Sequence, residues 1–450
     1  MTEPSARPAP YPPGGAAGTP GGSPVVGVVY DVGAAGPAEV AAAARACGAG
    51  VVLVVDTASD HVRHLLPVLA KRFTLCDVTG LDAAGAVAAV AAFAPAGLVT
   101  FSENRMETTS ALAAGLGIGH WHSPAVTRRL VDKLEQRRAF AAAGLDGPPF
   151  AAADKAVGVA DALGTVGLPA VLKPRRGTGS RFVTRVDSAA EARVAAAEFF
   201  AAAPGAELLV EGLLPGDAAG AGPEWGDYVS VETAVHGGAC HRLCVTGKFP
   251  LVRPFRERGS FVPHTLRPQL AEHAHELAEA AIAALGVRDG IVHTELKLTA
   301  DGPRLIEVNG RLGGLVGDVV RRGSGIDLVA AAMLLALGRP VRETPRFDGV
   351  AYQYTLMPPA GLPGMPGMPR TPRTPGEAAG RTTAKELGAL RLLPGVDLAD
   401  LRALEGPPAD WRGGATARLG RLHGRTRDHS DLAQLTHAID DICRPVLGDM

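Results

Sequence analysis

The sequence lacks the features that mark disulfide-rich, membrane-spanning and nucleic-acid-binding proteins. Its five cysteines in 450 residues show no disulfide framework. A formal net charge of −1 at pH 7 argues against nucleic acid or an anionic membrane as a partner. Ala-rich runs such as Ala84–Ala96 are broken by Gly and Pro and are too short to cross a bilayer, so we expect no membrane span.

Signals for secretion and for two common kinds of site are also missing. Residues 1–23 are rich in Pro, Gly, Ala and Ser without a hydrophobic signal core, which predicts a disordered tail and a cytoplasmic protein. Gly27–Gly33 lacks the G-x-G-x-x-G spacing of a dinucleotide site. No second pair accompanies Cys240–Cys244, so we expect a strand with partly buried thiols. His120 and His122 are predicted to belong to a loop or packing feature rather than to a ligand pair.

The most informative segment that is present runs from His293 to Arg311. Two alternating runs flank Ala300-Asp301-Gly302, which predicts a hairpin with a three-residue loop and a left-handed glycine. Side chains alternate along a strand, so the register fixes which of them share a face. Pairing Thr299 with Pro303 would place six side chains on one face, as the pairs Lys297 with Leu305, Glu295 with Glu307, and His293 with Asn309.

This face is predicted to bind a metal ion. Two facing carboxylates repel each other unless a cation compensates their charge. Glu295, Glu307 and Asn309 offer hard oxygen donors, which suit Mg²⁺ bound through carboxylates and nucleotide phosphates. Arg311 follows at the end of the strand, where it could meet a phosphate. The alternative is a solvated polar face without a ligand.

A glycine-rich turn further upstream suits a phosphate group. Gly177, Thr178, Gly179 and Ser180 lie between two β-type runs and lack the Gly-Lys-Ser/Thr ending of a P-loop. Such a turn can fold over a triphosphate and donate backbone N–H groups, and Lys173 would add an ammonium group. The alternative is an ordinary hairpin turn beside a surface lysine.

A chain of 450 residues is expected to hold two to four domains, and its hydrophobic patterning predicts an α/β protein. In the first part, strand-like runs alternate with Ala-rich helical stretches, which predicts a parallel sheet. The strands are expected at Val25–Tyr30, Val51–Val55 and Leu98–Phe101, and the helices at Ala38–Cys47 and Ala84–Phe93. Further helical segments are predicted at Ser123–Leu145, Gln269–Leu285 and Ile326–Leu337, with strands and a terminal helix between Thr416 and Leu447.

In order and spacing, these motifs resemble the ATP-grasp superfamily, and within it the carboxylate–amine ligases that include the L-amino-acid (dipeptide) ligases. The resemblance extends from about Leu98 to Gly338. It implies an ATP-grasp fold of mixed α/β class with a Rossmann-like domain at 24–125, a connector and lid subdomain at 126–212, and an antiparallel-sheet subdomain with the hairpin at 213–345. A C-terminal extension at 346–450, with a Pro/Gly-rich loop at 357–380, completes this division.

The same resemblance implies roles for individual residues. It implies ATP and two Mg²⁺ ions, which Mn²⁺ can replace, with Glu295, Glu307 and Asn309 as metal ligands and Arg311 on the reacting phosphoryl and acyl oxygens. The nucleotide contacts would be Lys133, Lys173, Gly177, Thr178, Gly179, Ser180, Glu211 and Glu232. The expected substrate contacts are Glu103, Glu257, Arg258, His293, Gly313 and Gly314.

The implied activity is that of an ADP-forming ligase, which joins a small-molecule carboxylate to an amine through an acyl phosphate. Phe182 replaces a frequent glycine after the phosphate loop, and Gly212 replaces a frequent second glutamate, which leaves the substrates open. Alternatives are transfer of the acyl group to a carrier protein or another nucleophile, and an inactive nucleotide-binding regulator. A homodimer is also left open. Biotin-dependent carboxylation is disfavoured because no lysine follows a methionine.

Overall fold

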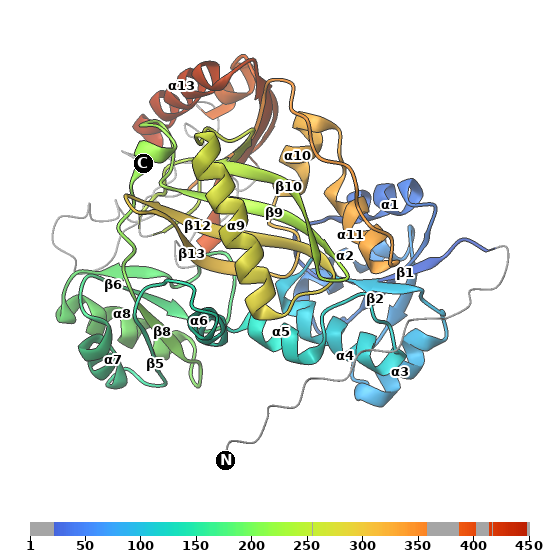
Figure 1. The fold of residues 1–450 in the computed structure, drawn as a ribbon. Coiled ribbons are helices and arrows are strands. Elements are labelled where there is room, and N and C mark those ends of the chain that lie inside the picture. The colour runs from blue at the N-terminus through green and yellow to red at the C-terminus, as the bar shows by residue number, and fades with distance from the viewer. Residues whose placement is uncertain (1–21, 254, 358–386, 402–413, 416, 448–450) are drawn as a thin grey trace, which may run out of the picture.

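The computed structural model describes residues 22–253, 255–357, 387–401, 414–415 and 417–447 (Figure 1). Apart from Gly22 and Ser23, the predicted disordered tail lies outside these residues, and so does the predicted loop at 357–380 apart from Met357. The described chain has the predicted mixed α/β class, with one parallel and two antiparallel sheets.

The N-terminal sheet has four parallel strands in the order β3-β2-β1-β4. Its strands are valine-rich and mostly buried, as expected when helices cover both faces. The strands are β1 (Val25–Val29), β2 (Gly50–Val55), β3 (Thr74–Asp77) and β4 (Gly97–Val99), and the helices are α1 (Pro37–Ala46), α2 (Asp60–Leu69), α3 (Ala83–Ala91) and α4 (Met106–Leu116). The predicted parallel α/β arrangement is confirmed; β3 and α2 were not predicted.

Two helices and a small antiparallel sheet follow. The predicted connector consists of α5 (Pro124–Val131) and α6 (Lys133–Ala142), separated at Asp132, whose carboxylate accepts from the backbone N–H groups that begin α6. The small sheet has the order β5-β8-β6-β7 and is packed against α7 (Gly158–Val166) and α8 (Ala189–Ala202). Its strands are β5 (Phe150–Ala153), β6 (Ala170–Pro174), β7 (Thr184–Val186) and β8 (Leu208–Gly212).

The third sheet has eight strands in the order β13-β12-β9-β10-β11-β14-β16-β15. The long helix α9 (Pro268–Leu285) lies across one face of it (Figure 1). The strands are β9 (Tyr228–His236), β10 (Ala239–Lys248), β11 (Gly259–Val262), β12 (Gly290–Thr299), β13 (Gly302–Asn309), β14 (Val350–Leu356), β15 (Val396–Asp400) and β16 (Gly420–Thr426). The other helices are α10 (Val316–Ser324), α11 (Leu328–Ala336) and α13 (His429–Leu447). Cys240 and Cys244 lie on β10, as the prediction of a strand there requires.

The hairpin of β12 and β13 has the predicted facing carboxylates but not the predicted register throughout. Thr299 pairs directly with Gly302, so Lys297 lies opposite Arg304 rather than opposite Leu305. A bulge then shifts the register by one residue, and beyond it Glu295 faces Glu307 and His293 faces Asn309. Leu305, predicted on the polar face, instead faces Leu296 in the core, because the turn is one residue shorter than predicted.

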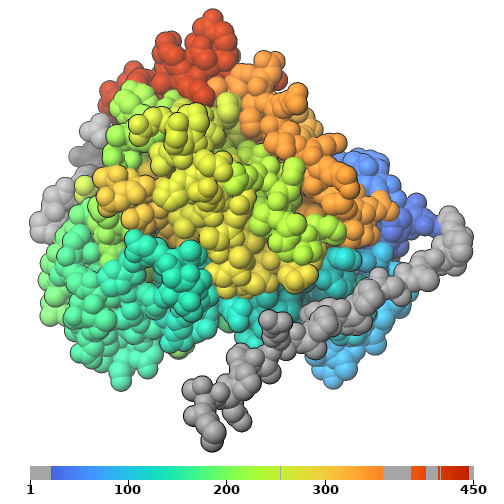
Figure 2. Space-filling view, viewed as in Figure 1, coloured from blue at the N-terminus to red at the C-terminus, as the bar shows by residue number. Residues whose placement is uncertain are grey.

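Hydrophobic packing divides the molecule differently from the three sheets. The N-terminal sheet and the eight-stranded sheet share one continuous buried core. The small sheet has a core of its own, and its residues form a separate teal and green lobe at the lower left of the space-filling view (Figure 2). Among the described residues, no helix combines the length and apolar character that crossing a bilayer requires.

Candidate active site

The centre of the site is the polar face of the hairpin. Asn309 donates from Nδ2 to Glu307 Oε1 at 3.2 Å, and His293 Nε2 lies 3.3 Å from Glu295 Oε1. Burial alone would raise the pKa of Glu307, but the ammonium groups of Lys133 and Lys173 outweigh it and lower the pKa to about 2. The Glu307 carboxylate is therefore ionised at neutral pH.

A buried pair behind the hairpin fixes the position of His293. The neighbouring strand β9 brings Glu232 opposite His293, and His293 Nδ1 lies 2.7 Å from Glu232 Oε1. Burial would lower the pKa of His293, but Glu232 and then Glu295 raise it to about 9. Gly313 permits this arrangement, because a Cβ atom there would lie 2.3 Å from His293 Nδ1. Gly314 has open space at the corresponding position.

Lys133 links the hairpin to the glycine-rich loop. Its Nζ lies 3.3 Å from Glu307 Oε2 and donates to the carbonyl of Gly177 at 2.8 Å. Burial would lower the pKa of Lys133, but Glu307 and Glu103 reverse this and raise it. The lysine thus carries a positive charge where the predicted phosphate loop and metal ligands meet.

Glu211 and two cations form a buried network between α6 and the central strands β6 and β8 of the small sheet. Arg137 binds the Glu211 carboxylate through two N–H groups at 2.7 and 3.2 Å, and Lys173 Nζ lies 2.8 Å from Oε2. Burial would raise the pKa of Glu211, but Arg137 and then Lys173 lower it to about 2. Arg137 also donates to the carbonyls of Leu305 and Ile306, which ties β8 to the bulge of the hairpin.

The glycine-rich loop has the backbone that its sequence predicts. Gly177 and Gly179 have φ values of 138° and 70°, which favour glycine. Ser180 and Phe182 also have positive φ, at 56° and 55°. A positive φ is unfavourable for a residue such as Phe182. The ring of Phe182 packs edge-on against Phe199, with the ring centroids 5.6 Å apart.

Arg311 connects three parts of the chain. Its Nε donates to Glu103 Oε2 at 2.8 Å, and its Nη2 lies 3.3 Å from both Asn309 Oδ1 and Thr178 Oγ1. Glu103, predicted to contact a substrate, is thus the ion-pair partner of Arg311. Both side chains are mostly buried. The pair is therefore not an exposed ion pair on the protein surface, which is the other role that an arginine at this position could have.

The remaining predicted substrate residues lie farther along the eight-stranded sheet. Glu257 pairs with Lys248 at 3.1 Å, and the Arg258 guanidinium pairs with Asp440 of α13 and lies 4.8 Å from the centre of the Tyr354 ring. Neither Lys248 nor Asp440 was predicted from the sequence. Lys248 closes β10 and is 3% exposed, whereas no local pattern marks Asp440, which is 182 residues from its partner.

The residues present fit the magnesium ions that the resemblance implies. Glu295, Glu307 and Asn309 supply oxygen donors from facing positions of two strands. Close by, Glu232 pairs with His293 through Oε1, while its Oε2 is buried without a hydrogen-bond partner among the described residues. The oxygen donors of Glu295, Glu307 and Asn309 suit Mg²⁺ or Mn²⁺ better than a soft metal ion.

Sequence comparisons find relatives that match part of the chain. No family model matches the chain. It is 33% identical over 195 residues to carnosine synthase 1 of Gallus gallus, covering 40% of this chain and 20% of that protein. It is also 27% identical over 241 residues to an uncharacterized protein, y4rH, of Sinorhizobium fredii, covering 52% of this chain and 47% of that one. The chain spans less than half the length of each curated relative that it matches.

Solved structures match over nearly the whole chain. An L-amino acid ligase from Bacillus licheniformis has a TM-score of 0.67 at 19% identity, covering 93% of this chain and 97% of that one. Carboxyaminoimidazole ribonucleotide synthase from Aspergillus clavatus, complexed with ATP, also has a TM-score of 0.67, at 14% identity, covering 94% and 99%. These neighbours are ATP-grasp ligases. Together with the three sheets described above, they show that the chain has the ATP-grasp fold.

Proposed function

We propose that this protein is an ATP-dependent carboxylate–amine ligase, which forms an amide between an amino acid or another small carboxylic acid and an amine. One observation carries the proposal: Lys133 contacts both Glu307 on the hairpin and Gly177 in the glycine-rich loop. Metal-type oxygen donors, a cation and a phosphate-type loop therefore converge at one point. The fold shared with an L-amino acid ligase supports an amino acid as one substrate.

In this proposal the small sheet and the hairpin hold the nucleotide between them. Lys133 and Lys173 compensate phosphate charge, and backbone N–H groups of the loop at 177–180 donate to phosphate oxygens. Glu295, Glu307 and Asn309 hold the magnesium ions, which when bound neutralise charge on the reacting phosphoryl oxygens. Phosphoryl transfer requires mainly positioning and charge compensation, which is what these residues offer.

The reaction proceeds in two displacements. A carboxylate oxygen of the acid bonds to the γ-phosphorus while the bond from that phosphorus to the ADP oxygen breaks, which gives an acyl phosphate and ADP. The amine nitrogen then bonds to the acyl carbon, the carbon–oxygen bond to phosphate breaks, and the nitrogen releases a proton. Arg311 can bind a phosphoryl and an acyl oxygen together through its planar fork of N–H groups.

Water must be kept from the acyl phosphate, which would otherwise hydrolyse. The glycine-rich loop connects β6 to β7 of the small sheet, and its glycines suit a movement that covers the nucleotide. Thr178 already contacts Arg311, so the loop reaches the reacting side of the hairpin.

The test is a screen of the full chain with ATP, Mg²⁺ and pairs of amino acids, small acids and amines. We expect release of ADP and phosphate that requires both an acid and an amine, and an amide of the summed mass less water by mass spectrometry. Glu307→Gln protein, prepared in the same way, controls for contaminating ATPases. Turnover that needs only a carrier-protein thiol as acceptor, or nucleotide binding without turnover, would contradict the proposal.

A further inference from the structure

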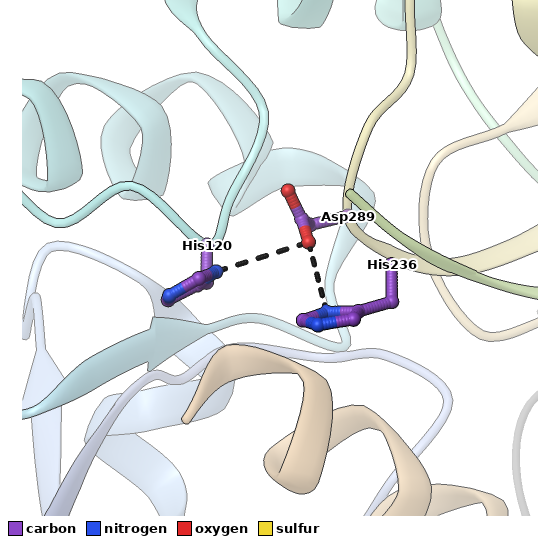
Figure 3. A group of neighbouring side chains, drawn as sticks. All are labelled: His120, His236 and Asp289. Carbon is purple, nitrogen blue, oxygen red and sulfur yellow. Dashed lines mark ion pairs between the residues drawn. The ribbon is translucent and has the colours of Figure 1, made fainter. Parts of the chain in front are cut away.

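Two histidines and an aspartate meet on the side of the molecule where the N-terminal sheet joins the eight-stranded sheet (Figure 3). His120 comes from the loop between α4 and α5, His236 ends β9, and Asp289 precedes β12. Asp289 Oδ1 lies 3.3 Å from His236 Nδ1 and 3.8 Å from His120 Nδ1. One ligand atom from each of the three residues lies within 4.8 Å of the others.

Backbone contacts hold two of the three side chains in place. Asp289 Oδ1 accepts from the N–H of Gly237, directly after His236. The carbonyl of Arg288 accepts from Gly238, and the Arg288 side chain donates to the carbonyl of Gly237. The turn after β9 and the segment before β12 are therefore bonded to each other, which orients His236 and Asp289 before any ligand binds.

The charges of the cluster are not compensated from elsewhere. Asp289 has 8% of its side chain exposed, and within the described residues its ion-pair partners are the two histidines alone. The Nδ1 atom of His236 is buried and has no hydrogen-bond partner in the described chain. A carboxylate oxygen and an imidazole nitrogen thus face each other, and no Lys or Arg of the described chain forms an ion pair with Asp289.

We propose that His120, His236 and Asp289 form a binding site for a borderline divalent transition-metal ion such as Zn²⁺, separate from the magnesium site. Imidazole nitrogens and a carboxylate suit Zn²⁺, whereas Mg²⁺ prefers oxygen donors. Ligand atoms about 2.0–2.1 Å from a tetrahedral zinc ion lie roughly 3.3 Å apart, as His236 and Asp289 already do. His120, whose Nδ1 lies 3.8 Å from Asp289 Oδ1, has to move closer, and water would take the fourth position.

The ion would join separate parts of the fold. His120 belongs to the loop between α4 and α5, while His236 ends β9 and Asp289 directly precedes the neighbouring strand β12 of the eight-stranded sheet. The imidazoles of His120 and His236 are 39% and 34% exposed, so an ion can reach them from solvent. An ion bound only by the folded state would raise the thermal stability of the protein.

The test uses tagless full-length protein treated with a chelator and kept in saturating Mg²⁺, so that hard-donor sites are filled. Titration with Co²⁺ reports the ligands by absorption, and competition with Zn²⁺ reports the affinity. We expect one Co²⁺ per chain, a visible spectrum without thiolate charge transfer, and a higher melting temperature with Zn²⁺. His236→Asn and His120→Asn should each weaken binding at least tenfold and remove the Zn²⁺-dependent rise in melting temperature.

His64→Asn is the matched control, because His64 is an exposed histidine on α2. It should bind Co²⁺ like the wild type. Equal Co²⁺ binding by wild type and both cluster variants, thiolate charge transfer, or no binding at all would overturn the proposal. His120→Asn keeps the test decisive if His236→Asn fails to fold, because the His120 side chain is the more exposed of the two. Neither result depends on ligase activity, so the proposed function is tested separately.

Discussion

The small sheet and the eight-stranded sheet stabilise themselves in different ways. The small sheet buries its own apolar cluster, whereas the eight-stranded sheet shares a continuous core with the N-terminal sheet. Contacts from the small sheet's unit to the rest are largely polar: Arg137 with Glu211, Lys133 with Gly177, Asp132 with Arg175, and Arg311 with Thr178. A polar interface can open and close without exposing a core, so we expect the small sheet to be the part that moves when nucleotide binds.

The largest effect should come from removing the anion of the buried network. Glu211→Gln leaves Arg137 and Lys173 buried without their counter-charge, which typically costs about 3–5 kcal/mol. We expect the free energy of unfolding at pH 7 to fall by that order, measured by urea denaturation. Arg138→Met, which removes an exposed pair with Glu135, is the control and should change stability by less than about 1 kcal/mol.

Wild type and Glu211→Gln can also be compared as a function of pH. The folded-state pKa of Glu211 is about 2, below its ordinary value of 4.5, so its contribution to stability is present above pH 4.5 and is lost as the pH falls toward 2. The difference between wild type and Glu211→Gln should therefore shrink across this interval. A difference that stays constant between pH 5 and pH 2.5 would mean that Glu211 is not held ionised by its neighbours.

On the eight-stranded side, Glu307→Gln should nearly abolish turnover while folding persists. It removes the carboxylate that faces Glu295 and meets Lys133, and loss of one such electrostatic group typically costs about a hundredfold or more in rate. Amide formation and melting temperature are measured on the same preparation. Near-normal product formation at saturating Mg²⁺ would remove Glu307 from the proposed metal site.

Arg311→Lys examines the point where the two regions meet. Because lysine cannot reproduce the planar fork, we expect ATP affinity within a few-fold of wild type but amide formation lower by about tenfold or more. Calorimetry and product yield on one variant separate the two effects. Glu103→Gln keeps Arg311 but removes its partner, so an equal loss there would show that the ion pair positions the arginine.

Added bulk beside His293 should affect stability rather than catalysis. Gly313→Ala would place Cβ 2.3 Å from His293 Nδ1, and such overpacking typically costs about 1–3 kcal/mol. Gly314→Ala meets no atom within 4 Å and serves as the stability control. Equal melting temperatures for the two variants would mean that His293 moves aside without cost.

Local signals and long-range contacts differ in how well the sequence predicts them. Alternation and turn chemistry placed Glu295 opposite Glu307 and gave the parallel N-terminal sheet. The turn was predicted one residue too long, because the prediction assumed unbroken alternation from Pro303 to Glu307, whereas a bulge interrupts it. The partners of Arg311 and Arg258 are 208 and 182 residues away, and the His120 cluster spans three segments, so only the fold brings them together.

The short turn and the bulge in the hairpin act as two shifts of opposite sense. With the present sequence, the short turn without the bulge, or the bulge without the short turn, would place the Glu307 side chain on the opposite face of the sheet. Its carboxylate would then point toward the apolar face that α9 covers (Figure 1). Together they restore the facing pair, so the geometry depends on their sum and not on the length of the turn. A relative could therefore lengthen the turn by one residue and lose Ile306 from the bulge, and still present the same two carboxylates. The number of residues in the turn therefore does not by itself decide whether such a hairpin presents the two facing carboxylates.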